Sequence, residues 1–299
     1  MKVLVLGKTG QLARELERTR WPAGWQVAFA SRSQIDLARP EVAAKAVLER
    51  MPDVAINAAA YTAVDKAETE PDLARAVNAL APGAIARACA SREIPFVTLS
   101  TDYVFDGLKD GAYTEYDAVA PLGAYGQSKV EGEDRVRSAQ PWHLILRTSW
   151  VFSPFGTNFV RTMLRLGAEQ PVLRVVADQR GRPTAAGDLA AAVIASTEAL
   201  VEDRRVSGTY HIANSEPATR HGFAMAIFEA ARRRGASVPN SVEAIGTADY
   251  PAPARRPLNS VLDCAMFERQ FGMRLRSWRP ALEQVLDELL ATDAAGSQG

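Results

Sequence analysis

The stretch Val3-Leu4-Val5-Leu6-Gly7-Lys8-Thr9-Gly10-Gln11-Leu12-Ala13, near the N-terminus, decides the fold. A short apolar run stops at a glycine, and apolar residues at helical spacing follow, which predicts a strand, a tight turn and a helix. In such a turn Gly7 and Gly10 would let backbone N–H groups at the helix N-terminus approach a pyrophosphate. Gln11 and Leu12 complete the candidate cofactor contacts. The pattern predicts a dinucleotide-binding turn, with an ordinary strand-to-helix turn as the alternative.

Short apolar runs alternate with helical patterns through the first half of the chain. Strands are predicted at 3–6, 26–30, 54–57, 96–100 and 144–148, and helices at 11–20, 41–51, 72–91 and 125–138. This alternation is typical of βαβ units with helices on both faces of a parallel sheet. The predicted fold class is therefore α/β, a doubly wound parallel sheet with a smaller C-terminal substrate-binding lobe. Residues 1–150 are expected to form the sheet domain and 151–291 mainly the lobe, with some segments returning to the sheet and 292–299 as a frayed tail.

Composition argues against several kinds of partner. The 35 Lys and Arg residues equal the 35 Asp and Glu residues, so no basic field points to nucleic acid. Apolar runs fall short of the ~20 residues that span a bilayer, and we expect a cytoplasmic protein without a membrane partner. Cys89 and Cys264 lie far apart, and the three histidines are isolated, so these residues predict neither a disulfide framework nor a metal site.

The end of the second predicted strand bears on cofactor choice. An NAD-selective site carries an acidic residue there, whereas this chain has Ser31-Arg32. A hydroxyl and a guanidinium suit a 2′-phosphate, which favours NADPH. NADH stays open, because Arg32 is almost as readily a solvated loop charge. Asp36 and Leu37 are candidates for the adenine edge, and a helix N-cap is the alternative for Asp36.

Tyr125 and Lys129 are four residues apart and therefore share one face of a predicted helix. Reduction of a ketone needs a proton donor, and a nearby ammonium would lower a phenol pKa of about 10 and could also bind the nicotinamide ribose. Upstream, Thr101 and Asp102 emerge at the carboxyl end of a predicted central strand, where ligands bind in such sheets. The combination favours a hydride-transfer site in which a hydroxyl at this strand end, that of Ser100 or Thr101, polarises the carbonyl. The alternatives are a tyrosine packed on the sheet beside a solvated lysine, and hydroxyls that cap a turn.

Five strings in the right order resemble the dTDP-4-dehydrorhamnose reductases, a family of the extended short-chain dehydrogenase/reductase superfamily. They lie at 7–12, 57–68, 100–107, 147–151 and 253–260, so the resemblance covers nearly the whole chain. It implies a Rossmann fold and NADPH-dependent reduction of the C4 ketone of dTDP-4-dehydro-L-rhamnose to dTDP-L-rhamnose, the last step in making that sugar donor. Tyr125 would then supply the proton, Thr101 would hold the carbonyl oxygen, and Lys129 would fix the ribose.

The resemblance also implies further contacts with cofactor and sugar. Ala60, Tyr61 and Thr62 would line the nicotinamide side together with Thr101. Trp150 would form a wall for the sugar. Independently of the resemblance, Asp102 lies near the expected crevice, where it would orient the ketosugar, with helix capping as its alternative.

A dTDP-sugar substrate needs cations for its diphosphate. Arg255 and Arg256 lie in a proline-rich loop and are candidates, with a solvated turn as the alternative. Asn158 is a candidate for the sugar or the base, with helix capping as the alternative. The resemblance further implies Mg²⁺ and a homodimer. No carboxylate spacing compels a metal site, so no metal ligand is assigned; Glu15 is the one candidate contributor, with a surface charge as its alternative.

Two other functions compete with this interpretation. The first is a 4-ketoreductase or epimerase for a different nucleotide-deoxysugar, because the same residue triad serves both. The second is a non-catalytic NADP-binding regulatory subunit on the same fold, which the intact Thr101, Tyr125 and Lys129 argue against.

Overall fold

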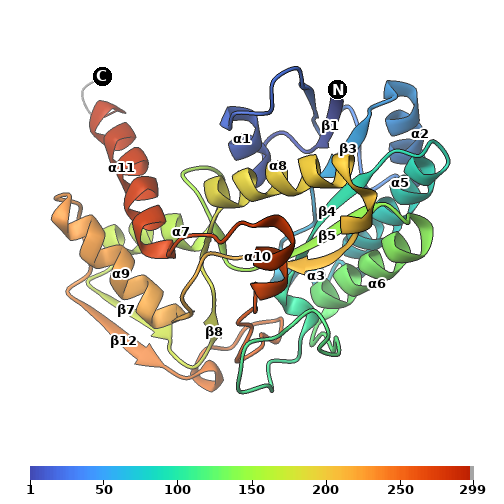
Figure 1. Ribbon diagram of the computed structural model, residues 1–299. Helices are drawn as coiled ribbons and strands as arrows, with labels where there is room; N and C mark the ends of the chain where they lie inside the picture. The colour runs from blue at the N-terminus through green and yellow to red at the C-terminus, as the bar shows by residue number, and fades with distance from the viewer. Residues whose placement is uncertain (297–299) are drawn as a thin grey trace.

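A computed structural model describes residues 1–296 and contains a six-stranded parallel sheet (Figure 1). Its strand order is β10-β5-β4-β3-β1-β2. The strands are β1 (Lys2–Leu6), β2 (Gln26–Ala30), β3 (Val54–Asn57), β4 (Phe96–Thr101), β5 (His143–Thr148) and β10 (Gly208–His211). The first five were predicted from the sequence to within one residue at each end. The sixth comes from the C-terminal half and pairs with β5, beginning with Gly208 opposite Leu144.

Helices cover both faces of the sheet because its strands are apolar on both sides. Val3 and Val5 point into one buried cluster, and Leu4 and Leu6 point into another. The first cluster is covered by α1 (Gln11–Arg18), α8 (Ala186–Glu202) and α10 (Ala265–Phe271). The second is covered by α2 (Pro40–Arg50), α5 (Ala81–Ala90) and α6 (Ala124–Ala139). The doubly wound parallel sheet is therefore confirmed (Figure 1).

The helix predicted over 72–91 is interrupted. It consists of α4 (Pro71–Arg75), the π-helical η1 (Ala76–Leu80) and α5, and the short α3 (Val64–Ala67) precedes it. Pro82 lies in the first turn of α5 and has no N–H to give to the preceding turn. A single π turn before it accommodates that missing hydrogen bond.

The C-terminal half builds a third apolar cluster that includes Phe223, Trp278 and Leu286. Around it lie α7 (Phe159–Glu169), α9 (Arg220–Arg233), α11 (Trp278–Gly296) and the parallel pair β7 (Val172–Val176) and β12 (Ser241–Ile245). The remaining elements are β6 (Val151–Phe152), β8 (Arg180–Gly181), β9 (Thr184–Ala185), β11 (Ala218–Thr219), η2 (Asp102–Val104), η3 (Arg204–Val206) and η4 (Thr247–Asp249). Of the tail predicted at 292–299, residues up to Gly296 belong to α11 and 297–299 lie outside the described residues. No helix within residues 1–296 is long and apolar enough to cross a membrane.

The order of the strands defines where a ligand can bind. From β1 the chain crosses to β2 on one side and then returns to β3 on the other side of β1. A crevice therefore opens at the carboxyl ends of β1 and β3, and in open α/β sheets this reversal is the usual ligand site. Thr101 of the predicted catalytic group is the last residue of β4 and therefore lies at this same edge of the sheet.

Candidate active site

The turn after β1 has the backbone of a dinucleotide-binding turn. Gly7 has φ +117°, a conformation that side chains rarely allow, and a Cβ there would lie 3.4 Å from the carbonyl oxygen of Ala58 after β3. Gly10 is the N-cap of α1, and a Cβ added to it would meet no atom of the described chain within 4 Å. Open space above the first turn of a helix, with its free N–H groups, suits a pyrophosphate.

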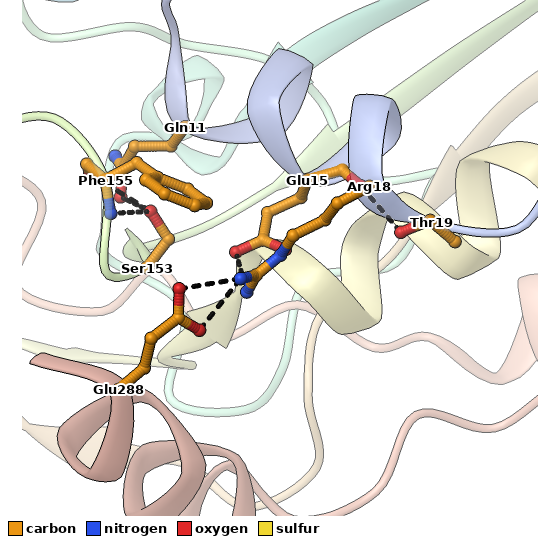
Figure 2. A network of polar contacts seen from close by, with 7 residues as sticks. All are labelled: Gln11, Glu15, Arg18, Thr19, Ser153, Phe155 and Glu288. Carbon is orange, nitrogen blue, oxygen red and sulfur yellow. Dashed lines mark hydrogen bonds and ion pairs between the residues drawn. The ribbon is translucent and has the colours of Figure 1, made fainter. Parts of the chain in front are cut away.

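The side chains of Gln11 and Leu12 are engaged within the protein. Leu12 packs into the core, so its backbone is the part that can face a cofactor. The Gln11 Oε1 atom accepts hydrogen bonds from Ser153 Oγ at 3.1 Å and Asn158 Nδ2 at 3.0 Å. Figure 2 shows Gln11 facing Ser153 across the loop that carries Phe155. Gln11 therefore connects the dinucleotide turn to the C-terminal half.

Asn158 has the capping role that was the alternative in the sequence. Its Oδ1 atom accepts a hydrogen bond of 3.1 Å from the backbone N–H of Arg161 in the first turn of α7. Its Nδ2 atom also donates to the Ser153 carbonyl oxygen at 2.8 Å. These bonds engage both polar atoms of its side chain, and a contact of Asn158 with the sugar or the base stays a prediction.

The carboxyl end of β2 is polar and open. Arg32 is 77% exposed in its side chain and lies 3.4 Å from Asp36. The hydroxyl of Ser31 hydrogen-bonds within the same loop, and Leu37 is buried. Asp36 does not cap α2, whose N-cap is Arg39. The exposed guanidinium and the hydroxyl are thus placed where a 2′-phosphate could meet them.

The loop after β3, with Ala60, Tyr61 and Thr62, is held by a residue that the sequence did not single out. Buried Asn78 accepts a hydrogen bond of 2.9 Å from the Tyr61 N–H and donates one of 2.9 Å to the Tyr61 carbonyl oxygen. It also donates to Ser128 on α6 at 3.0 Å. Asn78 therefore fixes this loop relative to the helix that carries the predicted catalytic pair.

The structure brings Thr101, Tyr125 and Lys129 together in a buried position. Thr101 is the last residue of β4, and the other two lie in the first two turns of α6. The Thr101 hydroxyl hydrogen-bonds with the Tyr125 phenol and lies 3.1 Å from Asp102 Oδ1. The Lys129 ammonium donates a 2.7 Å hydrogen bond to the carbonyl oxygen of Leu99.

The electrostatics of this group differ from the prediction. Burial raises the pKa of Tyr125, and the Thr101 hydrogen bond offsets this only in part. Lys129 is not among the groups that shift the Tyr125 pKa, so the lowering predicted from the sequence is not found. Burial instead lowers the pKa of Lys129 itself to about 8, while the charge of Glu133 opposes that change. Tyr125 is therefore a protonated phenol at neutral pH.

A buried ion pair holds α6 against the sheet. Glu133, one turn after Lys129, lies 2.7 Å from Arg147 on β5 and accepts a 2.5 Å hydrogen bond from Ser100 on β4. Both charged side chains are almost fully buried, at 4% exposure for Arg147 and 2% for Glu133. The ion pair fixes the helix with Tyr125 to β5, and the Ser100 hydrogen bond fixes it to β4, the strand that ends at Thr101. Sequence reasoning missed both contacts.

Trp150 is held in one orientation beside the site. Its φ of +46° is an uncommon backbone conformation for a bulky residue. A Cβ added to Gly181 would lie 2.6 Å from the indole Nε1, so only glycine leaves room for this ring. Backbone strain of this kind persists where surrounding structure imposes it, often at functional sites.

Asp102 is buried next to Thr101. Burial raises its pKa to about 6, and the Ser260 hydroxyl and the Arg220 guanidinium act in the opposite direction. Its Oδ2 atom has no hydrogen-bond partner of acceptable geometry within the described residues. A buried acceptor of this kind is available to a sugar hydroxyl.

The two predicted arginines of the proline-rich loop take different positions. Arg256 lies 2.8 Å from Asp65, which also accepts a hydrogen bond from the Ala254 N–H at 3.2 Å, so this pair anchors the loop. Arg255 is exposed and lines a small cavity beside Tyr125.

The Mg²⁺ expectation is not supported. Within the described residues no group of three or more His, Cys, Asp or Glu side chains is placed to hold a metal. The Glu15 carboxylate instead pairs with Arg18 at 2.6 Å, and Arg18 pairs with Glu288 of α11 at 2.7 Å (Figure 2). Glu15 is therefore a member of an ion-pair network between the two halves of the chain.

The doubly wound parallel sheet, the glycine turn after β1 and the Thr101, Tyr125 and Lys129 group define a Rossmann-fold protein of the short-chain dehydrogenase/reductase class.

Comparison with known proteins places the chain within that class. The family model "RmlD substrate binding domain" matches residues 1–291. A curated dTDP-4-dehydrorhamnose reductase of Escherichia coli strain K12 is 41% identical over 298 residues, covering 98% of this chain and 100% of the relative. The chain belongs to the dTDP-4-dehydrorhamnose reductase family.

Solved structures agree with this assignment. A crystal structure of a dTDP-4-dehydrorhamnose reductase from Clostridium acetobutylicum superposes with a TM-score of 0.89 at 37% identity, covering 97% of this chain and 100% of that one. Another, from Bacillus anthracis in complex with NADP, gives a TM-score of 0.87 at 33% identity and covers 96% and 99%.

Proposed function

We propose that this protein reduces the C4 ketone of dTDP-4-dehydro-L-rhamnose to dTDP-L-rhamnose with NADPH. Family membership supports the reaction, and the buried contact between Thr101 and Tyr125 at the carboxyl end of β4 is the observation that carries it. A reductase is favoured over an epimerase or a regulatory subunit because the curated relatives are named as reductases and the whole catalytic group is assembled.

The residues around the glycine turn fit a nicotinamide dinucleotide. Gly7 has a φ of +117°, which side chains rarely adopt, and a Cβ on Gly10 would point into open space, so the first turn of α1 would hold the pyrophosphate. Ser31 and Arg32 would hold the 2′-phosphate of NADPH. When bound, the cofactor supplies hydride to the carbonyl carbon. The NADP complex of the Bacillus anthracis relative supports this choice.

The remaining contacts follow from the same geometry. Ala60, Tyr61 and Thr62 would line the nicotinamide side, in a loop that Asn78 holds in place. Asp36 and Leu37 would lie toward the adenine. Residues 1–150 would thus bind the cofactor, and residues 151–291 would supply most of the substrate contacts.

Tyr125 would deliver the proton. A carbonyl that accepts hydride develops negative charge on oxygen, and a protonated phenol with a raised pKa can donate to it. The Thr101 hydroxyl, already in contact with the phenol, would hold the same oxygen. Lys129 would contribute a positive charge below its pKa of about 8 and hydrogen bonds to the ribose.

The substrate would lie between Asp102 and Trp150. The unpartnered Oδ2 atom of Asp102 would accept a hydrogen bond from a sugar hydroxyl. The indole of Trp150, which Gly181 leaves room for, would pack against the sugar. Arg255 would face the diphosphate from the loop beside Tyr125. The homodimer and the cytoplasmic location stay predictions.

The test is NADPH oxidation followed at 340 nm, the absorption band of the reduced nicotinamide, with the ketosugar generated enzymatically. Oxidation that requires both ketosugar and protein, with dTDP-L-rhamnose as product, is the expected result. Omission of the ketosugar and replacement by a UDP-ketosugar are the controls. No oxidation with dTDP-4-dehydro-L-rhamnose, despite measurable NADPH binding, would reject this function.

A further inference from the structure

A third arginine lies at the substrate side and was not predicted from the sequence. Arg220 is the first residue of α9, directly after its N-cap Thr219. Its guanidinium carbon stands 3.6 Å from the centre of the Trp150 ring and 5.3 Å from that of Phe159. A planar guanidinium stacked on an indole is held in one plane, with its N–H donors directed outward along the edge.

The carboxylate of Asp102 acts on the charge of Arg220, but the two side chains form no direct ion pair. Within the described part of the chain no carboxylate oxygen lies within the 4.0 Å limit of an ion pair with it, whereas Arg256 pairs with Asp65 at 2.8 Å. Its polar neighbour is the hydroxyl of Tyr103, which also interacts with Arg256. Arg220 is half-buried, and removing a guanidinium from water without a close carboxylate costs free energy.

These contacts place two cations around one phenol at the mouth of the site. Arg220 and Arg256 both approach the Tyr103 hydroxyl, and the Tyr103 ring packs edge-on against Tyr125 with centroids 5.8 Å apart. A sugar carbonyl at Tyr125 would leave the other end of the sugar, with its attached phosphates, near these arginines. An anion there would offset the buried positive charge.

We infer that Arg220 binds the diphosphate of the nucleotide-sugar and, by stacking, fixes the Trp150 wall that faces the sugar. This assignment rests on the proposed function for its substrate class. Arg255 faces the cavity from the opposite loop, so the diphosphate would be held from two separate segments of the chain.

The experiment compares two ligands that differ only in the presence of the diphosphate group. Calorimetric titration of the NADPH-bound protein with dTDP and with thymidine measures the diphosphate contribution. Arg220→Met should weaken dTDP binding about 10-fold to 100-fold, the range for a lost charge-assisted hydrogen bond, and leave thymidine binding unchanged. Arg220→Lys, which keeps the charge without the planar stack, should lose less.

Arg204→Met is the matched control. The Arg204 guanidinium also stacks on an indole, 3.7 Å from the ring centre of Trp142, but on the exposed surface. It should leave both titrations unchanged. NADPH affinity and the circular dichroism spectrum report whether each variant is folded.

Two results would overturn the inference. One is wild-type affinity of Arg220→Met and Arg220→Lys for dTDP. The other is an equal loss for dTDP and thymidine, which would show that Arg220 shapes the pocket without binding phosphate. The same experiments separate this inference from the proposed function. If Arg220→Met weakens dTDP binding but the wild-type protein does not reduce the ketosugar, the proposed reaction is rejected and the diphosphate contact stands.

Discussion

The ammonium of Lys129 donates a 2.7 Å hydrogen bond to the carbonyl oxygen of Leu99, two residues before Thr101 on β4. This bond ties α6 to the central strand at the level of the site. It also directs the ammonium to the backbone, and Lys129 does not shift the Tyr125 pKa. The buried phenol therefore keeps its proton at neutral pH, which is the state required of the acid in a ketone reduction.

Replacing that phenol tests its role. Tyr125→Phe should lower kcat by about 100-fold or more, the usual effect of losing a general acid, and leave NADPH affinity unchanged. The rate is measured from NADPH oxidation and the affinity from NADPH fluorescence. Tyr116→Phe is the control, since Tyr116 is 85% exposed. Turnover near the wild-type rate in Tyr125→Phe would remove Tyr125 from the mechanism.

The ionised carboxylate of Asp102 should lower the free energy of unfolding above pH 6. Its pKa rises from 3.8 to about 6 on folding, so between these values the native state binds more protons than the unfolded state. Stability of the wild type therefore falls as pH rises through this window and stays at the lower level above it. Asp102→Asn removes the penalty.

We expect Asp102→Asn to be more stable than wild type at pH 7.5, by on the order of 2–3 kcal/mol, with the gain shrinking as pH falls below 6. The same variant should bind the ketosugar less well, because a carboxylate acceptor is lost. Urea unfolding at pH 7.5 and pH 4.5 gives the difference, with the exposed Asp110→Asn as control. A destabilised Asp102→Asn at pH 7.5 would contradict the burial argument.

Local sequence was sufficient for five strands because each is a short apolar run ended by a turn. It could not assign β10, since Gly208–His211 has no strong apolar pattern and gains its place by pairing with β5, which is more than 60 residues earlier. The interrupted helix was also missed, because the π turn before Pro82 is a local response to one missing N–H.

The residues of the site also fall into those that local sequence could predict and those that it could not. Thr101, Tyr125 and Lys129 belong to short motifs, and their residue types carry the chemistry. Asn78 and Arg220 do not belong to any such motif. Their roles come from contacts with Tyr61, 17 residues away, and with Trp150 in another segment. The shift of the Tyr125 pKa was mispredicted for a related reason, since burial depends on the whole fold and outweighed helical spacing.

Removing one partner of the buried pair of Glu133 and Arg147 should be costly, because the other charge then stays buried without compensation. Glu133→Gln leaves the Arg147 guanidinium buried without its carboxylate, and we expect a loss of about 3–5 kcal/mol in the free energy of unfolding. Glu169→Gln, which breaks the exposed pair with Arg165, should change it by less than about 0.5 kcal/mol. Equal effects in urea unfolding would refute the distinction.

Cofactor preference should depend on Arg32. The Arg32→Ala variant should raise KM for NADPH much more than KM for NADH, because only NADPH carries the 2′-phosphate. Steady-state rates with each cofactor at saturating ketosugar measure this ratio. Arg39→Ala, at an exposed arginine of the same connection, is the control. Parallel losses for both cofactors would show that Arg32 does not contact the 2′-phosphate.

Gly181 should be required for the position of the substrate wall. An alanine Cβ would lie 2.6 Å from the Trp150 indole nitrogen, closer than packed atoms allow, and the Arg220 guanidinium that stacks on the ring at 3.6 Å restricts the movement of the indole. Gly181→Ala should therefore displace the indole and lower kcat/KM by about 10-fold or more, as expected when a positioning group shifts.

Gly111→Ala separates this effect from the general cost of changing a glycine, because a Cβ there meets no atom of the described chain within 4 Å. It should keep wild-type kcat/KM. Trp150 is proposed to contact the ketosugar and not the cofactor, so the NADPH affinity of Gly181→Ala should match that of the wild type. If kcat/KM of Gly181→Ala is unchanged, the indole is free to move and the rigid-wall argument fails.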